Sequence, residues 1–181
     1  MGRRMSSAAR TDMPLRVVAR QYAVYSRAYC RLAQGARVST VIDEVARKLG
    51  GKSVLGAAVR SQADLALAIG RRLPLAALRG LAAAGFSESE IDRFVIPQRT
   101  RRHRAGKKQP LTLEESDRAV RMLRIQTVAE NVFGSRDKGN IWLRRPLAEL
   151  RGAAPLDFAQ TETGARVVET ILAKIAWGAA A

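Results

Sequence analysis

The chain has 181 residues, and 47% of them are hydrophobic, which is enough for one medium domain or two small ones. Its 32 lysines and arginines outnumber 16 aspartates and glutamates, so the formal net charge is +16 and the sequence pI is near 11.4. This composition excludes a disordered chain and favours a polyanionic partner, either nucleic acid or an anionic membrane surface. The apolar runs are shorter than the ~18 to 20 residues that a membrane-spanning helix needs.

The positive charge is concentrated in the first part of the chain. Residues 1–110 carry 22 basic and 7 acidic side chains, whereas residues 111–181 carry 10 and 9. We therefore expect the polyanion contact in the first part and a separate task for the second, because a nearly neutral surface gains little from attraction to phosphates. The single cysteine, Cys30, excludes an intrachain disulfide and a cysteine metal cluster, and it favours a cytoplasmic location.

Helical periodicity runs through the chain without strand-like alternation, which predicts an all-α fold. The first predicted helix begins after Asp12 and ends at Gly35. Its apolar stripe consists of Leu15, Val18, Tyr22, Tyr25, Tyr29 and Leu32. We expect this stripe to pack against protein rather than to lie on a membrane surface, and the sequence leaves both possibilities open. A second helix has the apolar face Val41, Ile42, Val45 and Leu49, and residues 1–50 form a predicted basic N-terminal extension.

Short, closely spaced helices follow in residues 51–108. Ser87 caps one of them, with Glu90 at the capping-box position, and Pro97 begins the next. A short helix, a tight turn through Val95 and Ile96, and a second helix begun by proline are the layout of a helix-turn-helix. We therefore predict a helix-turn-helix DNA-binding domain at residues 51–108.

The second of these two helices is strongly basic and contains no acidic residue. Its first turn is the part that reaches base edges in such motifs, while basic residues further along neutralise phosphates. The predicted DNA-binding residues are Gln98, Arg99, Thr100, Arg101, Arg102, Arg104, Lys107 and Lys108. A small, polar segment closed by Pro110 then separates this domain from residues 111–181.

The second part begins with the clearest helix of the chain. Thr112 and Glu115 form a predicted capping box, and the helix extends to Phe133 before Gly134. Ser135 caps a further helix that ends before Pro146. A last helix extends through Trp177, with a core face made of Val168, Ile171, Leu172 and Ile175.

Motifs of catalysis are missing from the sequence. It contains no GxGxxG, GxxxxGK[ST], HExxH, GxSxG or EF-hand pattern, so we expect no enzymatic activity, catalytic residue, cofactor or metal. The one histidine, His103, lies among arginines, which favours contact with phosphate or solvent over proton transfer. The acidic cluster Glu114, Glu115 and Asp117 is explained by helix capping and needs no metal.

A family resemblance covers residues 111–181. The matching residues are 111–118, 124–125, 129–130, 132–134, 142–143, 146, 150, 155–157, 161, 164–166, 168–169 and 175. This pattern resembles the Xre/MbcA/ParS-like toxin-binding domain of antitoxins, and residues 51–108 resemble the Xre-like helix-turn-helix domain that precedes it. The chain departs from the family at Leu147, where asparagine is frequent, and at Arg151, where a glycine pair is frequent.

The resemblance implies a cytoplasmic antitoxin of a type II toxin-antitoxin system. Its partner would be a RES-domain toxin that consumes NAD or ADP-ribosylates, and the antitoxin would cover the toxin's active site. The complex would also bind its own operator DNA as a repressor, with a homodimer and a toxin-antitoxin hetero-oligomer as assemblies. The implied toxin-binding residues are Trp142, Arg144, Arg166, Glu169, Lys174, Trp177, Gly178 and Ala181.

Three alternatives remain open on the sequence alone. Trp177 could anchor the toxin or could close the core under the last helix. The protein could be a helix-turn-helix transcriptional regulator without a toxin, whose C-terminal domain only dimerises. It could also be a general binder of nucleic acid or membrane surfaces that uses its arginine-rich N-terminus.

Overall fold

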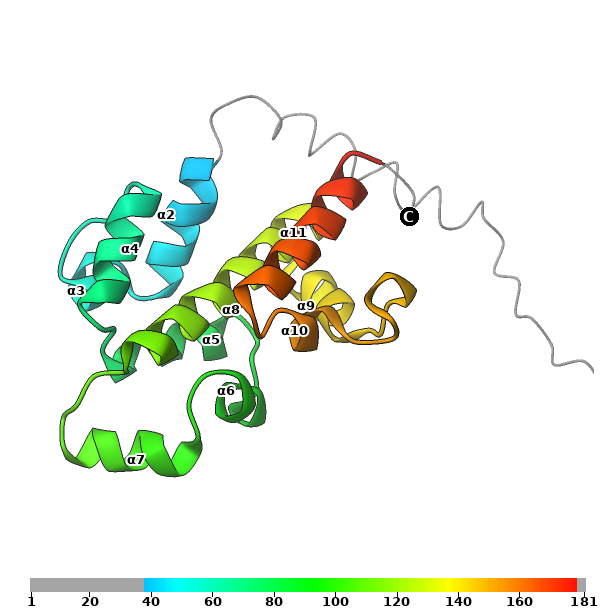
Figure 1. The fold of residues 1–181 in the computed structure, drawn as a ribbon. Helices are drawn as coiled ribbons and strands as arrows, with labels where there is room; N and C mark the ends of the chain where they lie inside the picture. Colours follow the sequence, from blue (N-terminus) through cyan, green and yellow to red (C-terminus); the bar gives the residue numbers. More distant parts are fainter. Residues whose placement is uncertain (1–37, 179–181) are drawn as a thin grey trace, which may run out of the picture.

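The computed structural model describes residues 38–178, and all regular secondary structure within them is helical, as the sequence predicts. The elements, shown in Figure 1, are α2 (Val38–Lys48), α3 (Gly51–Leu55), α4 (Gln62–Gly70), the 3-10 turn η1 (Leu75–Ala77), α5 (Leu78–Ala83), α6 (Glu88–Phe94), α7 (Gln98–Gly106), α8 (Leu113–Phe133), α9 (Arg136–Arg144), the 3-10 turn η2 (Ala148–Leu150), α10 (Pro155–Phe158) and α11 (Glu162–Ala176). The stripe expected at Leu15–Leu32, Cys30 and the C-terminal Ala181 lie outside the described residues.

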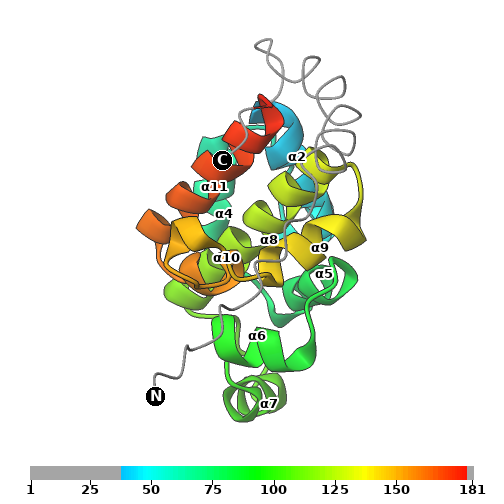
Figure 2. The same cartoon turned by 90° about the vertical axis from the view of Figure 1, so that its right-hand side faces the viewer.

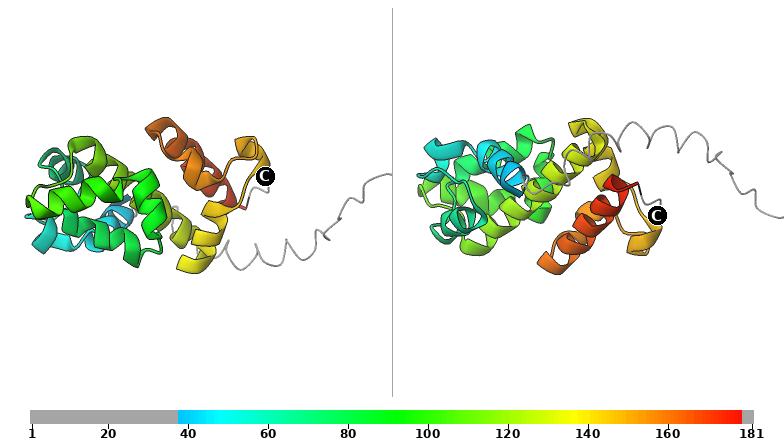
Figure 3. Two further views of the ribbon diagram at one scale, coloured as in Figure 1. Left: turned by 90° about the horizontal axis from the view of Figure 1, so that it is seen from below. Right: turned by 90° about the horizontal axis from the view of Figure 1, so that it is seen from above.

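Helix α8 is the central element of the fold. Of its 21 residues, 12 are buried, because α2, α4, α5, α6, α9 and α11 all contact it. Figure 3 shows the helices that precede α8 gathered toward one end of the molecule and α9, α10 and α11 toward the other. The two parts therefore share one hydrophobic core, which extends from Ile42 to Ala176.

The ends of α8 follow from local chemistry that the sequence displays. The Thr112 hydroxyl accepts a hydrogen bond from the Glu115 amide at 3.2 Å, and the Glu115 carboxylate accepts one from the Thr112 amide at 2.8 Å. This is the predicted capping box. At the other end, Gly134 takes a left-handed conformation with φ 64°, which stops the helix.

Helix α2 packs into the core, although it precedes residue 51. Ile42, Val45 and Leu49 are buried and Val41 is partly buried, which confirms the predicted apolar face. The Lys48 ammonium donates to Gln126 at 2.9 Å, to Thr127 at 3.0 Å and to Glu130 at 2.7 Å, all on α8. Burial alone would raise the pKa of Glu130, but the hydrogen bond and charge of Lys48 outweigh it, and the pKa lies below its ordinary value.

Helix α5 approaches the end of α2 very closely. A Cβ at Gly80 would lie 2.1 Å from the Lys48 carbonyl oxygen, so only glycine allows this backbone contact. The region before α6 is therefore positioned by α2 and α8 together.

Candidate functional site

Helices α6 and α7 form the helix-turn-helix that the sequence predicts. The Ser87 hydroxyl accepts from the Glu90 amide, and the Glu90 carboxylate accepts from the Ser87 amide at 2.8 Å, which completes the capping box of α6. Val95 and Ile96 are buried in the turn, and α7 begins after Pro97. Figure 2 shows α7 at one edge of the molecule, beyond α6.

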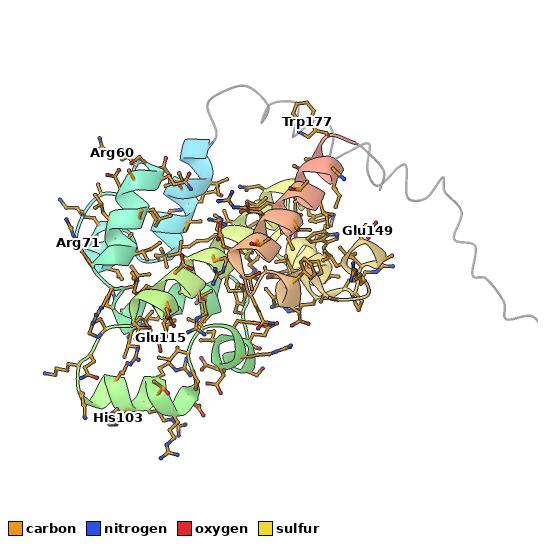
Figure 4. All side chains as sticks on the ribbon, in the orientation of Figure 1. Arg60, Arg71, His103, Glu115, Glu149 and Trp177 are labelled. Atoms are coloured by element: carbon orange, nitrogen blue, oxygen red, sulfur yellow. The ribbon has the colours of Figure 1, made fainter. Side chains whose placement is uncertain are left out.

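Helix α7 has no buried residue, so it is not attached to the core by apolar side chains of its own. Two ion pairs attach it instead. Arg101 pairs with Glu88 at the start of α6, and Arg104 pairs with Glu115 at the start of α8. The Arg104–Glu115 pair is well shielded, since the two side chains are 17% and 8% exposed. Figure 4 shows Glu115 on the side of α8 that faces α7.

These pairs divide the predicted DNA-binding residues into two groups. Thr100, Arg101 and Arg104 are partly buried, and both arginines are engaged with carboxylates. The exposed group consists of Gln98, Arg99, Arg102, Lys107 and Lys108, together with His103. Within residues 38–178, the four basic residues of this group form no ion pair, so they can meet a polyanion without first breaking one.

The predicted toxin-binding residues also divide into two groups. Arg166, Lys174, Trp177 and Gly178 are exposed on α11 or at its end. Arg166 is paired only loosely, with its Nε 3.5 Å from the Glu162 carboxylate and its side chain 77% exposed. Trp177 is 71% exposed, which does not fit the alternative in which it closes the core. In Figure 4 it lies at the C-terminal end of α11.

Three other members of the predicted toxin-binding set are engaged within the fold. The centre of the Trp142 ring lies 5.7 Å from the centre of the Phe133 ring. Glu169 accepts a hydrogen bond from Arg124 on α8 at 2.8 Å, and Arg144 pairs with Glu90 at 2.7 Å. These residues therefore hold helices together, although each side chain remains partly exposed.

Arg124 connects α8 to α11 through two carboxylates. It donates to Glu169 at 2.8 Å and to Glu162 at 3.1 Å. Burial alone would lower the pKa of Arg124, but the two carboxylates outweigh it and the pKa is raised. This contact therefore adds to the buried apolar face of α11 in holding it against α8.

The structure adds exposed apolar residues that sequence reasoning missed. Ile141 is 69% exposed on α9, Phe158 is 38% exposed on α10, and Val167 is 39% exposed on α11. Val167 could have been found from helical spacing, because it falls off the core face that Val168, Ile171 and Leu172 define. Isolated exposed apolar residues are ordinary, and Trp177, the C-cap of α11, is the most exposed of the described large apolar residues.

The described part of the chain offers no metal centre and no membrane-spanning helix. No group of three or more histidine, cysteine, aspartate or glutamate side chains within residues 38–178 could hold a metal ion. No helix in that range is long and apolar enough to cross a bilayer. The acidic residues at the start of α8 serve as caps or ion-pair partners.

Two family models match adjoining segments of the chain. Residues 64–124 match the antitoxin Xre-like helix-turn-helix domain, and residues 128–178 match the antitoxin Xre/MbcA/ParS C-terminal toxin-binding domain. The two segments meet within α8. The first contains α6 and α7, and the second contains α9 and α11.

Curated relatives agree with these matches. The chain is similar to Antitoxin Xre of Pseudomonas putida, with 40% identity over 84 residues, covering 46% of this chain and 53% of the relative. It is 32% identical over 95 residues to Antitoxin Xre of Photorhabdus laumondii, covering 51% and 64%. It is 27% identical over 124 residues to the Prs ADP-ribosylating antitoxin of a Sphingobium species, covering 55% and 78%. The chain thus spans between half and two thirds of the length of the two Xre relatives. Because it carries both domains in the family's order, it belongs to the Xre/MbcA/ParS-like antitoxin family.

Proposed function

We propose that this protein is the antitoxin of a type II toxin-antitoxin pair, which neutralises a RES-domain toxin and binds its own promoter as a repressor. The observation that carries the proposal is the match of residues 128–178 to a toxin-binding domain whose last helix presents an exposed tryptophan. In this proposal the protein acts in the cytoplasm by occlusion, without catalysis or a cofactor of its own.

The outer face of α11 is the proposed toxin contact. Trp177 supplies the largest exposed apolar surface at the C-terminal end of α11, Val167 is exposed nearer its start, and Arg166 and Lys174 add positive charge. Interfaces draw most of their binding energy from a few anchors of this kind, and tryptophan and arginine are the commonest. An exposed aromatic side chain at a helix end suits insertion into a cleft of the toxin.

The proposed DNA contact is the exposed group on α7. Gln98 and Arg99 in its first turn would meet base edges, while Arg102, Lys107 and Lys108 would meet phosphates. Arg101 and Arg104 hold α7 in place through Glu88 and Glu115. In this proposal a homodimer places two copies of α7 on the operator, because helix-turn-helix proteins commonly read paired half-sites.

The toxin contact is tested by co-expression and co-purification with the product of the adjacent gene. Trp177→Ala should weaken the complex by about 30-fold, the loss expected for an anchor worth about 2 kcal/mol. Leu67→Ala is the matched control, because Leu67 is 62% exposed on α4, away from α11. If the neighbouring product stops growth and this protein neither rescues nor co-purifies with it, the antitoxin proposal fails and the regulator without a toxin remains.

The DNA contact is tested by titrating promoter and scrambled DNA at several salt concentrations. Arg99→Ala should relax base preference, whereas Lys107→Ala should weaken binding to all sequences and reduce the log-log salt slope by about 0.9. Equal losses on every sequence for both variants would contradict the assignment of base and phosphate contacts. Equal affinity of the unaltered protein for both DNAs would indicate a general nucleic-acid binder.

A further inference from the structure

The toxin-binding segment contacts the helix-turn-helix at the turn between α5 and α6, and Arg93 on α6 also pairs with Asp157 on α10 at 2.9 Å. Asn140 on α9 donates to the Ala84 carbonyl at 2.9 Å, and Arg144 donates to the Gly85 carbonyl at 2.9 Å. The two residues belong to the segment that matches the toxin-binding domain, whereas the turn belongs to the helix-turn-helix segment. The contact therefore joins the two functional parts directly.

Arg144 is the centre of this contact, and each of its three guanidinium nitrogens donates a hydrogen bond. Its Nε donates to one oxygen of Glu90 at 2.7 Å, and its Nη2 donates to the other oxygen at 2.8 Å. Its Nη1 donates to the Asn140 carbonyl at 2.9 Å, and the group lies 5.9 Å from the centre of the Phe86 ring. A paired contact with both carboxylate oxygens requires the planar fork of arginine, which lysine lacks.

Glu90 connects Arg144 to the helix-turn-helix. The carboxylate that Arg144 binds also caps α6, because it accepts the Ser87 amide at 2.8 Å. Burial alone would raise the pKa of Glu90, but the hydrogen bonds from Arg144 and Ser87 outweigh it, and the pKa lies below its ordinary value. Glu88, in the same first turn, pairs with Arg101 on α7. Since α7 buries no side chain of its own, its orientation depends on its ion pairs with Glu88 on α6 and Glu115 on α8, and the first of these moves with the start of α6.

We propose that Arg144 is a positioning residue for the DNA-recognition helix, so that the C-terminal domain sets the orientation in which α7 meets DNA. The inference rests on the proposed DNA binding by α7. It assigns Arg144 a task different from the toxin contact that the family resemblance implies. The charged residues that face Glu90 across the contact are Arg144 on α9 and, at the rim of the same shallow cleft, Arg136 and Asp137.

The first test measures amide hydrogen exchange of the full chain carrying Arg144→Gln, Arg144→Lys or Glu90→Gln. Glutamine at position 90 can still cap α6, so this variant removes only the charged contact. All three should speed exchange in residues 84–106 and leave α8 and α11 unchanged. Arg145→Gln, next to Arg144 and exposed, is the control and should change nothing. Unchanged exchange in residues 84–106 for Arg144→Gln would overturn the proposal.

The second test measures affinity for promoter DNA in the absence of any partner. Arg144→Gln and Arg144→Lys should each weaken binding roughly tenfold, the range expected when a charge-assisted hydrogen-bond pair is lost. The salt slope should stay the same, because no phosphate contact is removed, whereas Lys107→Ala lowers it. A reduced slope for Arg144→Gln would show a direct phosphate contact and overturn the positioning role.

The two tests separate the inference from the function on which it rests. If the unaltered protein does not prefer its promoter, the proposed repressor function fails, and the exchange data still decide whether Arg144 positions α6 and α7. In a double-mutant cycle, the losses of DNA affinity caused by Glu90→Gln and Arg144→Gln should also be non-additive, because both changes remove the same contact. Additive effects would contradict the direct coupling of the two side chains.

Discussion

Replacing Lys48 by methionine tests whether α2 belongs to the folded core. The Lys48 ammonium is the donor to three acceptors on α8, Gln126, Thr127 and Glu130. Methionine keeps most of the aliphatic side chain and removes only this donor. Gln126 and Thr127 are 0% exposed, so water cannot easily replace the lost contacts.

The magnitude follows from the burial of each acceptor. A buried acceptor that loses its donor costs about 1 kcal/mol at the low end of the measured range, which gives about 2 kcal/mol for Gln126 and Thr127 together. The Glu130 side chain is 33% exposed, so water replaces part of its lost contact, and the pair adds about 0–1 kcal/mol. We expect Lys48→Met to lower the free energy of unfolding by about 2–3 kcal/mol.

Urea unfolding followed by circular dichroism at the helix band measures this loss. With a slope of about 2 kcal/mol per molar, the midpoint should fall by about 1–1.5 M, while the exposed Lys52→Met should shift it by less than about 0.3 M. The difference should shrink as pH falls below 4.5, because the pKa of Glu130 lies below that value in the fold and its charged contact is lost on protonation. Equal midpoints for the two variants would refute the packing of α2 on α8.

Three further predictions concern stability. Gly80→Ala should cost about 1–3 kcal/mol in urea unfolding, because its Cβ would clash with the Lys48 carbonyl, whereas Gly106→Ala, which meets no atom within 4 Å, should not destabilise the protein. The pKa of Glu90 is depressed, so its stabilising contribution is present above pH 4.5 and lost as pH falls through its folded pKa. Glu90→Gln should therefore flatten the acid limb of a plot of unfolding free energy against pH. An unchanged curve would contradict the Arg144 contact. Arg104→Met should lower the unfolding free energy by about 1–3 kcal/mol, because it leaves Glu115 without its cation. Arg102→Met, at an exposed position, should change it by less than about 0.5 kcal/mol. Similar losses for the two variants would count against the buried pair.

Sequence reasoning located most helix ends, because the signals that end helices are local. The capping boxes at Ser87 and Thr112 and the stop at Gly134 involve residues within one turn of each other, so three or four letters of sequence suffice to predict them. The turn before Pro97 was predictable for the same reason. The helix-turn-helix layout followed from these local signals.

Sequence reasoning was less successful at predicting which partners the charged residues have. Arg101 and Arg104 were expected on DNA, yet they pair with Glu88 and Glu115, which are 13 and 11 residues away in sequence. Arg144 was expected on the toxin, yet it pairs with Glu90, 54 residues away. A run of arginines shows how many charges are present but not which of them meet a carboxylate within the fold. That depends on the angle at which helices pack.

The sequence by itself determined the helical class, the helix-turn-helix, the basic character of α7 and the family, because each rests on neighbouring residues or on an ordered motif. The tertiary structure alone decided which of the predicted residues remain exposed to a partner. The arrangement of the helices brings Arg104, Arg144 and Glu169 to ion-pair partners on α8 and α6 and leaves Arg99, Arg102 and Trp177 at the surface. The physical reason is that a charge partner is chosen by distance in space, which only the packed helices define.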